Sequence, residues 1–327
     1  MQSRGGRQLA YYMGIDGGGT KTQAVLADEN GNILSRAVSG ASNPNAVGEQ
    51  QLIHVFQTLF LELDNEEKTR LKNVKLVYAG IAGSANPANH TLLESILSKL
   101  LPYATVFVEP DAVCALYSGT YGGAGIVQIA GTGSITYGMN EAGEQGRVGG
   151  WGYLFGDEGS GYAIGRAGVT EALKSVDGRG EPTILLEMLY EHFQVLQPQE
   201  LIKKVYNAKQ PKTIIAPLSR IVFQAYAQED VVAQAILQQA AKDIASQIMS
   251  LYRTLFTNDE KTKVVLCGGV FQEKAVMPVL LKDYLKNIPL ILVQPEFPPV
   301  AGSLIGAYKQ ATIQVSQNML EQMKNTQ

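Results

Sequence analysis

Two glycine-rich turns, each between two short apolar segments, constrain the fold of this chain more than any other feature. The first lies between Tyr11–Asp16 and Thr22–Asp28, and the second, Gly131–Gly133, lies between Ile126–Ala130 and Ser134–Met139. Short apolar runs separated by glycine are typical of strands joined by tight turns. The same opening occurs twice, about 115 residues apart, which predicts two domains of similar construction. A length of 327 residues also suits two cores better than one.

Strands and helices alternate after each of these openings. In the first half we expect a strand at Ile33–Val38, a helix with apolar positions from Leu52 to Leu63, a strand at Val74–Tyr78, a helix at Thr91–Leu101, a strand at Thr105–Val108 and a helix at Asp111–Tyr117. In the second half we expect a helical region from about Asp157 to Phe256, strands at Val264–Cys267 and Leu290–Val293, and helices near Lys274–Leu285, Ala301–Gln310 and Gln314–Gln327. This alternation predicts α/β sheets covered by helices. The glycine-rich break Gly119–Gly125 is the expected domain junction.

Composition excludes several classes of protein. Lys and Arg number 27 against 30 Asp and Glu, for a net charge of −3, so we expect no nucleic-acid partner. No segment approaches the roughly 20 apolar residues of a membrane span, so we expect no membrane partner. The two cysteines, Cys114 and Cys267, supply neither a disulfide framework nor a cysteine-rich zinc site, which favours a reduced cytoplasm. The polar segment Met1–Gln8 is left out of the fold prediction.

The first glycine turn has the chemistry of an anion site. Its three glycines allow positive φ and bring backbone N–H groups together, and converging N–H dipoles bind anions. The turn continues into a hydroxyl and a cation, so the expected phosphate-binding residues are Gly18, Gly19, Thr20 and Lys21. Asp16 would hold Mg²⁺ there, directly or through water. The chain contains no Gly-Lys dipeptide for a Walker A loop and no Rossmann glycine pattern. A plain glycine-rich hairpin stays open as the alternative.

Two further glycine clusters repeat this chemistry at strand ends. Thr132 and Gly133 lie in the second turn, and together the two turns could clamp the phosphates of one nucleotide. Gly268 and Gly269 follow the strand that ends at Cys267, where bare backbone lets a flat base or ribose approach. The alternatives are a tight turn for the former and a close helix–strand contact for the latter.

Seven short segments in this order make the chain resemble the N-acetylglucosamine kinase and BadF/BadG/BcrA/BcrD ATPase family, within the sugar-kinase, Hsp70 and actin superfamily. They are Gly14–Thr22, Gly40–Asn43, Glu109–Ala112, Ala130–Ser134, Gly149–Gly152, Gly156–Ser160 and Cys267–Val270. The resemblance implies two ribonuclease-H-like (actin-like ATPase) α/β domains with a nucleotide and sugar cleft between them. The expected domains are residues 9–118, completed by the C-terminal helix at about 301–325, and residues 119–300 with a helical insertion.

The resemblance also implies site residues, each with a simpler alternative. Asp111 would be the base that accepts the proton of the attacking sugar hydroxyl, or only the N-cap of the helix Ala112–Tyr117. Asn43 would discriminate sugar hydroxyls, or only form a turn before Pro44. Gly150, Trp151 and Gly152 would bind the acetamido side of the sugar, and the alternative for Trp151 is a core position. Asp157 would bind sugar hydroxyls. Ala216, opening the helix after Pro211, would line the adenine pocket.

The resemblance therefore implies an ATP- and Mg²⁺-dependent kinase of an N-acetylated amino sugar, most simply N-acetylglucosamine at its 6-hydroxyl. N-acetylmuramic acid and glucosamine compete as acceptors. The partners would be the sugar, ATP and a second copy of the chain. The alternative within the family is an ATPase that activates a dehydratase or reductase through an iron–sulfur cluster held by cysteines. Neither Cys114, inside a predicted helix, nor Cys267 is placed as a ligand of such a cluster.

Overall fold

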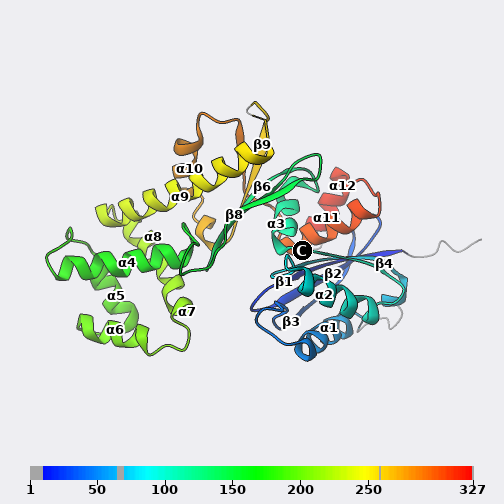
Figure 1. The fold of residues 1–327 in the computed structure, drawn as a ribbon, viewed down its shortest axis with the longest axis horizontal. Coiled ribbons are helices and arrows are strands. Elements are labelled where there is room, and N and C mark those ends of the chain that lie inside the picture. The colour runs from blue at the N-terminus through cyan, green and yellow to red at the C-terminus, as the bar shows by residue number, and fades with distance from the viewer. Residues whose placement is uncertain (1–9, 65–69, 258, 326–327) are drawn as a thin grey trace, which may run out of the picture. The chain divides into compact units, whose positions relative to one another are not determined.

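The computed structural model describes residues 10–64, 70–257 and 259–325, and they separate into two compact units (Figure 1). Unit 1 comprises Met1–Gly123 and Pro295–Gln327, and unit 2 comprises Ala124–Gln294. The expected domains were 9–118 with 301–325, and 119–300. Residue 9 and the end of the expected helix at Gln314–Gln327 lie outside the described residues.

Unit 1 is built on a mixed five-stranded sheet. Its strands run in the order β3-β2-β1-β4-β5. The hairpin partners β1, β2 and β3 are antiparallel, whereas β1, β4 and β5 are parallel. Its elements are β1 (Tyr11–Gly17), β2 (Thr22–Asp28), β3 (Ile33–Ser39), α1 (Glu49–Leu63), η1 (Leu71–Asn73), β4 (Val74–Ile81), α2 (Pro87–Leu100), β5 (Thr105–Glu109), α3 (Asp111–Thr120), α11 (Pro299–Gln310) and α12 (Gln317–Asn325).

Unit 2 repeats this sheet. Read from β8, its strand order is β8-β7-β6-β9-β10, with antiparallel pairs at β6–β7 and β7–β8 and parallel pairs at β6–β9 and β9–β10. The predicted recurrence of the opening is therefore confirmed at the level of topology. The elements are β6 (Gly125–Ala130), β7 (Ser134–Met139), β8 (Gln145–Gly149), α4 (Gly161–Val176), α5 (Leu185–Phe193), α6 (Pro198–Tyr206), α7 (Pro211–Ile215), η2 (Ala216–Leu218), α8 (Ser219–Ala227), α9 (Val231–Leu255), β9 (Thr262–Cys267), η3 (Gly269–Phe271), α10 (Met277–Leu285) and β10 (Leu290–Val293).

The strand β8 was not predicted. Its sequence, Gln-Gly-Arg-Val-Gly, lacks the apolar alternation by which a strand is detected. Pairing with β7 holds it in the sheet, from Met139 opposite Gln145 to Ile135 opposite Gly149. Here the tertiary partner decides the conformation, not the local preference.

The sheet of unit 1 is covered on both faces. Side chains alternate along β1, so Met13 and Ile15 join the buried cluster that includes Leu52 and Phe56 of α1. The other face receives α11, whose Ser303 hydroxyl donates to the carbonyl of Ile15 at 2.8 Å. The C-terminal part of the chain therefore completes the layer that α3 begins.

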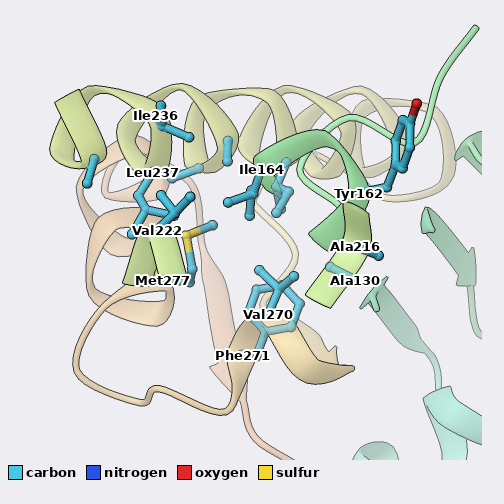
Figure 2. Packing of buried hydrophobic residues seen from close by; sticks show 14 of the residues in the cluster. Ala130, Tyr162, Ile164, Ala216, Val222, Ile236, Leu237, Val270, Phe271 and Met277 are labelled. Carbon is cyan, nitrogen blue, oxygen red and sulfur yellow. The ribbon is translucent and has the colours of Figure 1, made fainter. Parts of the chain in front are cut away.

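The helices of unit 2 pack around a second core (Figure 2). The long helix α9 begins at the cap Asp230, whose carboxylate accepts from the Ala233 N–H at 2.8 Å, and it buries Ile236 and Leu237 in the cluster. Ile164 of α4 and Val222 of α8 complete the labelled centre of this core.

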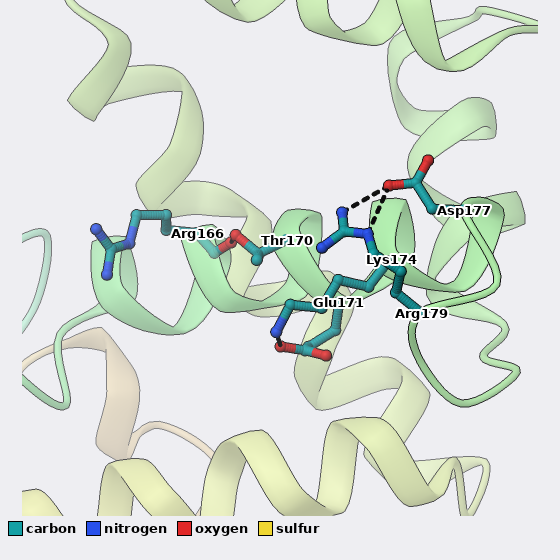
Figure 3. Close-up of polar contacts among 6 residues, drawn as sticks. All are labelled: Arg166, Thr170, Glu171, Lys174, Asp177 and Arg179. Atoms are coloured by element: carbon teal, nitrogen blue, oxygen red, sulfur yellow. Dashed lines mark hydrogen bonds and ion pairs between the residues drawn. The ribbon is translucent and has the colours of Figure 1, made fainter.

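Polar side chains of α4 and of the turn after it make local contacts (Figure 3). Lys174 binds Glu171 one turn earlier at 2.7 Å, and Arg179 binds Asp177 at 2.6 Å in the turn that follows the helix. Such pairs are ordinary features of a solvated helix surface. They carry no indication of a ligand.

Among the helices described, none has the length and hydropathy needed to cross a bilayer.

Candidate active site

Two carboxylates of unit 1 converge where the parallel strands end. Asp16 lies near the end of β1 and is paired in register with Gly80 of β4, which is paired in turn with Glu109 of β5. Asp111 follows β5 and begins α3. A Cβ atom on Gly80 would lie 3.5 Å from the Cα atom of Asp111 and would overlap the Cys114 sulfur. The absence of that atom lets the start of α3 approach β4 closely enough to bring Asp111 beside Asp16.

The cap alternative for Asp111 is wrong in its position. Pro110 is the N-cap of α3, and Asp111 is the first helical residue. The carboxylate still accepts a hydrogen bond from the Ala112 N–H at 3.1 Å. The side chain is therefore oriented by the backbone of its own helix, which leaves a second carboxylate oxygen for another partner.

Burial raises the pKa of both carboxylates. Burial raises the pKa of Asp16 from 3.8 to about 6, the charge of Asp111 adds to this, and Lys21 opposes it. Burial also raises the pKa of Asp111, against the hydrogen bond from Ala112. A carboxylate with a raised pKa is a better proton acceptor at neutral pH. A cation beside the pair would relieve the repulsion.

These donors fit Mg²⁺. The ion prefers one or two carboxylates together with phosphate and water oxygens, and Asp16 and Asp111 offer hard oxygen donors beside the predicted phosphate turn. Within the residues that the structure describes, no group of three or more histidine, cysteine or acidic side chains could hold a metal.

The first glycine turn is open to solvent at its tip. Gly19, Thr20 and Lys21 are exposed, and a Cβ atom on Gly19 would meet nothing within 4 Å. The expectation of positive φ in this turn was wrong, because Gly17, Gly18 and Gly19 all lack a left-handed φ. Glycine leaves room here instead of supplying an unusual conformation.

The loop that contains Ser42 packs against the first glycine turn. The Ser42 N–H donates to the Gly18 carbonyl at 3.0 Å, and a Cβ atom on Gly17 would overlap the buried Ser42 hydroxyl. The next residue, Asn43, accepts from the Asn45 N–H at 2.9 Å, so the turn predicted as its alternative role is present. The structure thereby joins Asn43 to the first turn, and sequence reasoning missed the support that Ser42 gives.

A pocket of about 750 Å³ in unit 2 gathers three of the predicted nucleotide segments. Gly131 and Thr132 come from the second glycine turn, Ala216 from η2 and Gly269 from η3. Its volume lies in the range of small-molecule sites. Val270 and Ala216 belong to both the pocket wall and the core in Figure 2, so the wall rests on packed side chains.

The third glycine cluster requires glycine for two reasons. Gly268 has a φ of +104°, and a Cβ atom there would overlap the carbonyl of Ala130 at the end of β6. The ends of β6 and β9 therefore touch, a strand–strand contact instead of the helix–strand contact proposed as the alternative. Gly269 then faces the pocket, where a Cβ atom would meet nothing within 4 Å.

Ala216 lies in the pocket wall, but it does not open the helix after Pro211 as expected. Pro211 opens α7, and Ala216 begins the following 3₁₀ turn. Sequence reasoning missed the residues that share its face: Arg220, Phe223, Gln224 and Ala227 of α8 also line the pocket. They follow Ala216 by about 4, 7, 8 and 11 residues, which is the spacing of one helix face, and that periodicity was the available signal.

Trp151 is exposed, so the alternative of a core tryptophan is wrong. Its exposed fraction is 68 %, and the Arg147 guanidinium lies 4.3 Å from the ring centroid. The flanking Gly149, Gly150 and Gly152 all have a left-handed φ between +68° and +87°. Such φ values exclude most side chains, so the glycines fix the loop that presents the ring.

Asp157 is buried and lies against the second glycine turn. It has a left-handed φ of +59°, and its carboxylate would be 2.9 Å from a Cβ atom on Gly133. The Lys212 ammonium lies 3.4 Å from the same carboxylate. The structure thus links Asp157 to the turn that contains Thr132, a connection that the sequence did not indicate.

Comparisons with known proteins agree with this geometry. An N-acetylmuramic acid/N-acetylglucosamine kinase of Clostridium acetobutylicum is 34 % identical over 262 residues, which is 80 % of this chain and 86 % of the relative. An N-acetyl-D-glucosamine kinase of Dictyostelium discoideum is 35 % identical over 294 residues, covering 85 % and 91 %. The crystal structure of a Chromobacterium violaceum protein superposes with a TM-score of 0.73 at 25 % identity and covers 91 % of this chain and 99 % of that one.

The family model described as the BadF/BadG/BcrA/BcrD ATPase family matches residues 13–307. That span contains both sheets except for the first two residues of β1, together with the carboxylate pair of unit 1 and the pocket of unit 2. The chain belongs to the BadF/BadG/BcrA/BcrD ATPase family.

Proposed function

We propose that this protein is an ATP-dependent kinase of an N-acetylated amino sugar, with N-acetylglucosamine phosphorylated at its 6-hydroxyl as the first candidate reaction. One observation carries the nucleotide part: residues from three distant segments, Gly131–Thr132, Ala216 and Gly269, line one pocket. The names of two relatives at 34 % and 35 % identity support an amino sugar as acceptor.

The proposed chemistry is phosphoryl transfer to a hydroxyl. The sugar oxygen attacks the γ-phosphorus, the bond from phosphorus to the bridging oxygen of ADP breaks, and Asp111 accepts the hydroxyl proton. The raised pKa of Asp111 suits this role, because a carboxylate in a polar, solvated place would be a weaker base. Mg²⁺, held through Asp16, would neutralise phosphate charge when bound.

The other site residues would bind and orient. The hydroxyls of Thr20 and Thr132, with the backbone N–H group of Gly19, would donate to phosphate oxygens. The Gly18 N–H already donates to the Lys21 carbonyl at 3.0 Å, so Gly18 would shape the turn instead. Asn43 and Asp157 would bind sugar hydroxyls, and Trp151 with its flanking Gly150 and Gly152 would lie against the acetamido group. We further propose a homodimer that works in the cytoplasm; light scattering on the purified protein tests the dimer.

The alternative function, activation of a dehydratase or reductase, needs cysteine ligands for an iron–sulfur cluster. Cys114 is fully buried in α3, where burial raises the pKa of its thiol well above the ordinary value. Cys267 is buried at the end of β9. Cluster ligands are thiolates, so both cysteines disfavour this alternative.

A coupled assay of ADP release separates the two functions. The acceptors are N-acetylglucosamine, N-acetylmuramic acid, glucosamine, N-acetylmannosamine and glucose, each with MgATP, and a reaction without sugar is the control. We expect release that depends on an N-acetylated sugar, with ³¹P spectra placing the phosphate on the 6-oxygen. Release that is equal with and without every sugar would refute the kinase proposal.

A further inference from the structure

The side-chain contacts of Lys212 are made with residues outside its own helix. It is the second residue of α7, in a first turn where carboxylates are favoured over cations. Its ammonium lies 3.4 Å from the Asp157 carboxylate, and the two side chains are 31 % and 6 % exposed. The same ammonium lies 5.5 Å from the centroid of the Tyr153 ring. Lys212 is therefore held by partners outside its helix.

The carboxylate that Lys212 pairs with, Asp157, lies beside the second glycine turn. Asp157 is pressed against Gly133, in the turn whose neighbours Gly131 and Thr132 line the pocket. A buried carboxylate beside a phosphate-binding turn repels a polyphosphate across a short distance of low dielectric. Without a compensating charge, the same group that serves a sugar would weaken nucleotide binding.

The position of Lys212 along the chain connects the nucleotide pocket with the carboxylate proposed to bind sugar. Its neighbour Thr213 and, four residues on, Ala216 both line the nucleotide pocket. Tyr153, over which the ammonium lies, packs edge-on against Tyr162 of α4, with ring centroids 5.1 Å apart. The cation is thus held between the Tyr153 ring and the Asp157 carboxylate, while the residue after it in α7, Thr213, lines the pocket.

We infer that Lys212 is a positioning residue whose positive charge offsets the negative charge of Asp157. This offset lets a carboxylate that binds sugar lie beside a turn that binds phosphate without repelling the nucleotide. The inference rests on the proposed function. It assigns Lys212 an effect on nucleotide affinity that passes through Asp157. Loss of the ammonium therefore weakens binding only while the Asp157 carboxylate is present.

Four variants test this by calorimetry with Mg²⁺ and a non-hydrolysable ATP analogue, without sugar. Lys212→Met should weaken binding about tenfold or more, because it leaves a buried charge without its partner. Lys212→Met with Asp157→Asn should return affinity to within about threefold of wild type, since the repelling charge is gone. Lys212→Arg should retain most of the affinity. Lys209→Met removes the same charge from an exposed position before α7 and should leave affinity unchanged.

The inference is overturned if Lys212→Met binds the analogue as tightly as Lys209→Met, or if the double variant binds as weakly as Lys212→Met alone. Thermal unfolding of each variant identifies a loss caused by misfolding, which the double variant would not repair. The readout does not use sugar phosphorylation. Wild-type protein that phosphorylates none of the sugars while the affinity pattern holds would refute the proposed acceptor and leave the role of Lys212 standing.

Discussion

Replacing Asp16 by asparagine should stabilise this protein at neutral pH while it removes activity. Burial and the charge of Asp111 raise the pKa of Asp16 from 3.8 to about 6 in the folded protein. In the unfolded chain the carboxyl returns to its ordinary value, so ionisation at pH 7 costs the folded state free energy. At 1.36 kcal/mol per pH unit the difference corresponds to about 3 kcal/mol as an upper bound. Partial exposure of the side chain lowers the expected gain to about 1–3 kcal/mol.

The sign of the effect sets its pH dependence. Between about pH 4 and pH 6 the folded protein binds more protons at Asp16 than the unfolded chain does, so wild-type stability falls as pH rises through this window. Asparagine does not titrate. The stability advantage of Asp16→Asn should therefore be full at pH 7.5, about half at pH 5 and absent near pH 4.

Urea unfolding at these three pH values, in buffer with chelator, measures the gain directly. Asp283→Asn makes the same chemical change on the exposed face of α10 and should change the free energy of unfolding by less than about 0.5 kcal/mol. Added Mg²⁺ should stabilise wild type and not the variant, since ligand binding to the folded state alone raises its stability. If Asp16→Asn is less stable than wild type at pH 7.5 without metal, the ionised Asp16 carboxylate does not destabilise the folded protein, and the reasoning is refuted.

Four further substitutions test separate parts of the molecule. Asp111→Asn should fold normally and bind ATP, with kcat on the best sugar reduced about 10²-fold or more; turnover within a few-fold of wild type would exclude Asp111 as the base. Thr132→Val should raise the KM for ATP about tenfold by removing a hydroxyl donor to phosphate, with sugar KM unchanged. Trp151→Ala should raise the KM for N-acetylglucosamine more than the KM for glucosamine. An equal rise in both KM values would show that the ring does not contact the acetamido group. Gly302→Ala should cost about 3 kcal/mol in urea unfolding because its methyl group overlaps a carbonyl of α3, while Gly40→Ala meets only ordinary contact and should cost less than about 1 kcal/mol.

The repeated sheet was predictable because each of its hairpins is local. A strand, a glycine turn and a second strand are close in sequence, so composition and spacing alone indicate them. The strands Thr22–Asp28, Ser134–Met139 and Leu290–Val293 have the predicted bounds. The family resemblance supplied what local pattern cannot, namely that loops more than 80 residues apart, such as Thr132 and Ala216, belong to one pocket.

The missed features depend on contacts that residue composition does not indicate. The strand β8 lacks apolar alternation and is held by its pairing with the neighbouring strand β7. The turn at Ser42 is fixed by its bond to Gly18, which is distant in sequence. The left-handed φ of Asp157 could not be predicted from residue type, because non-glycine residues rarely adopt it. A neighbouring Gly133 that leaves room for the carboxylate, and Lys212 that pairs with it, are visible only once the chain is folded.

The two glycine turns, though alike in sequence, differ in how their carboxylates are compensated. Beside the first turn, burial and the charge of Asp111 raise the pKa of Asp16, and Lys21 opposes this. Such an arrangement favours an added cation. Beside the second turn, Asp157 has its cation built in, as Lys212. In two copies of one fold, the charged groups beside each turn, rather than the glycine pattern, therefore determine how the carboxylate is compensated. The first copy would take a metal ion and the second already contains a lysine.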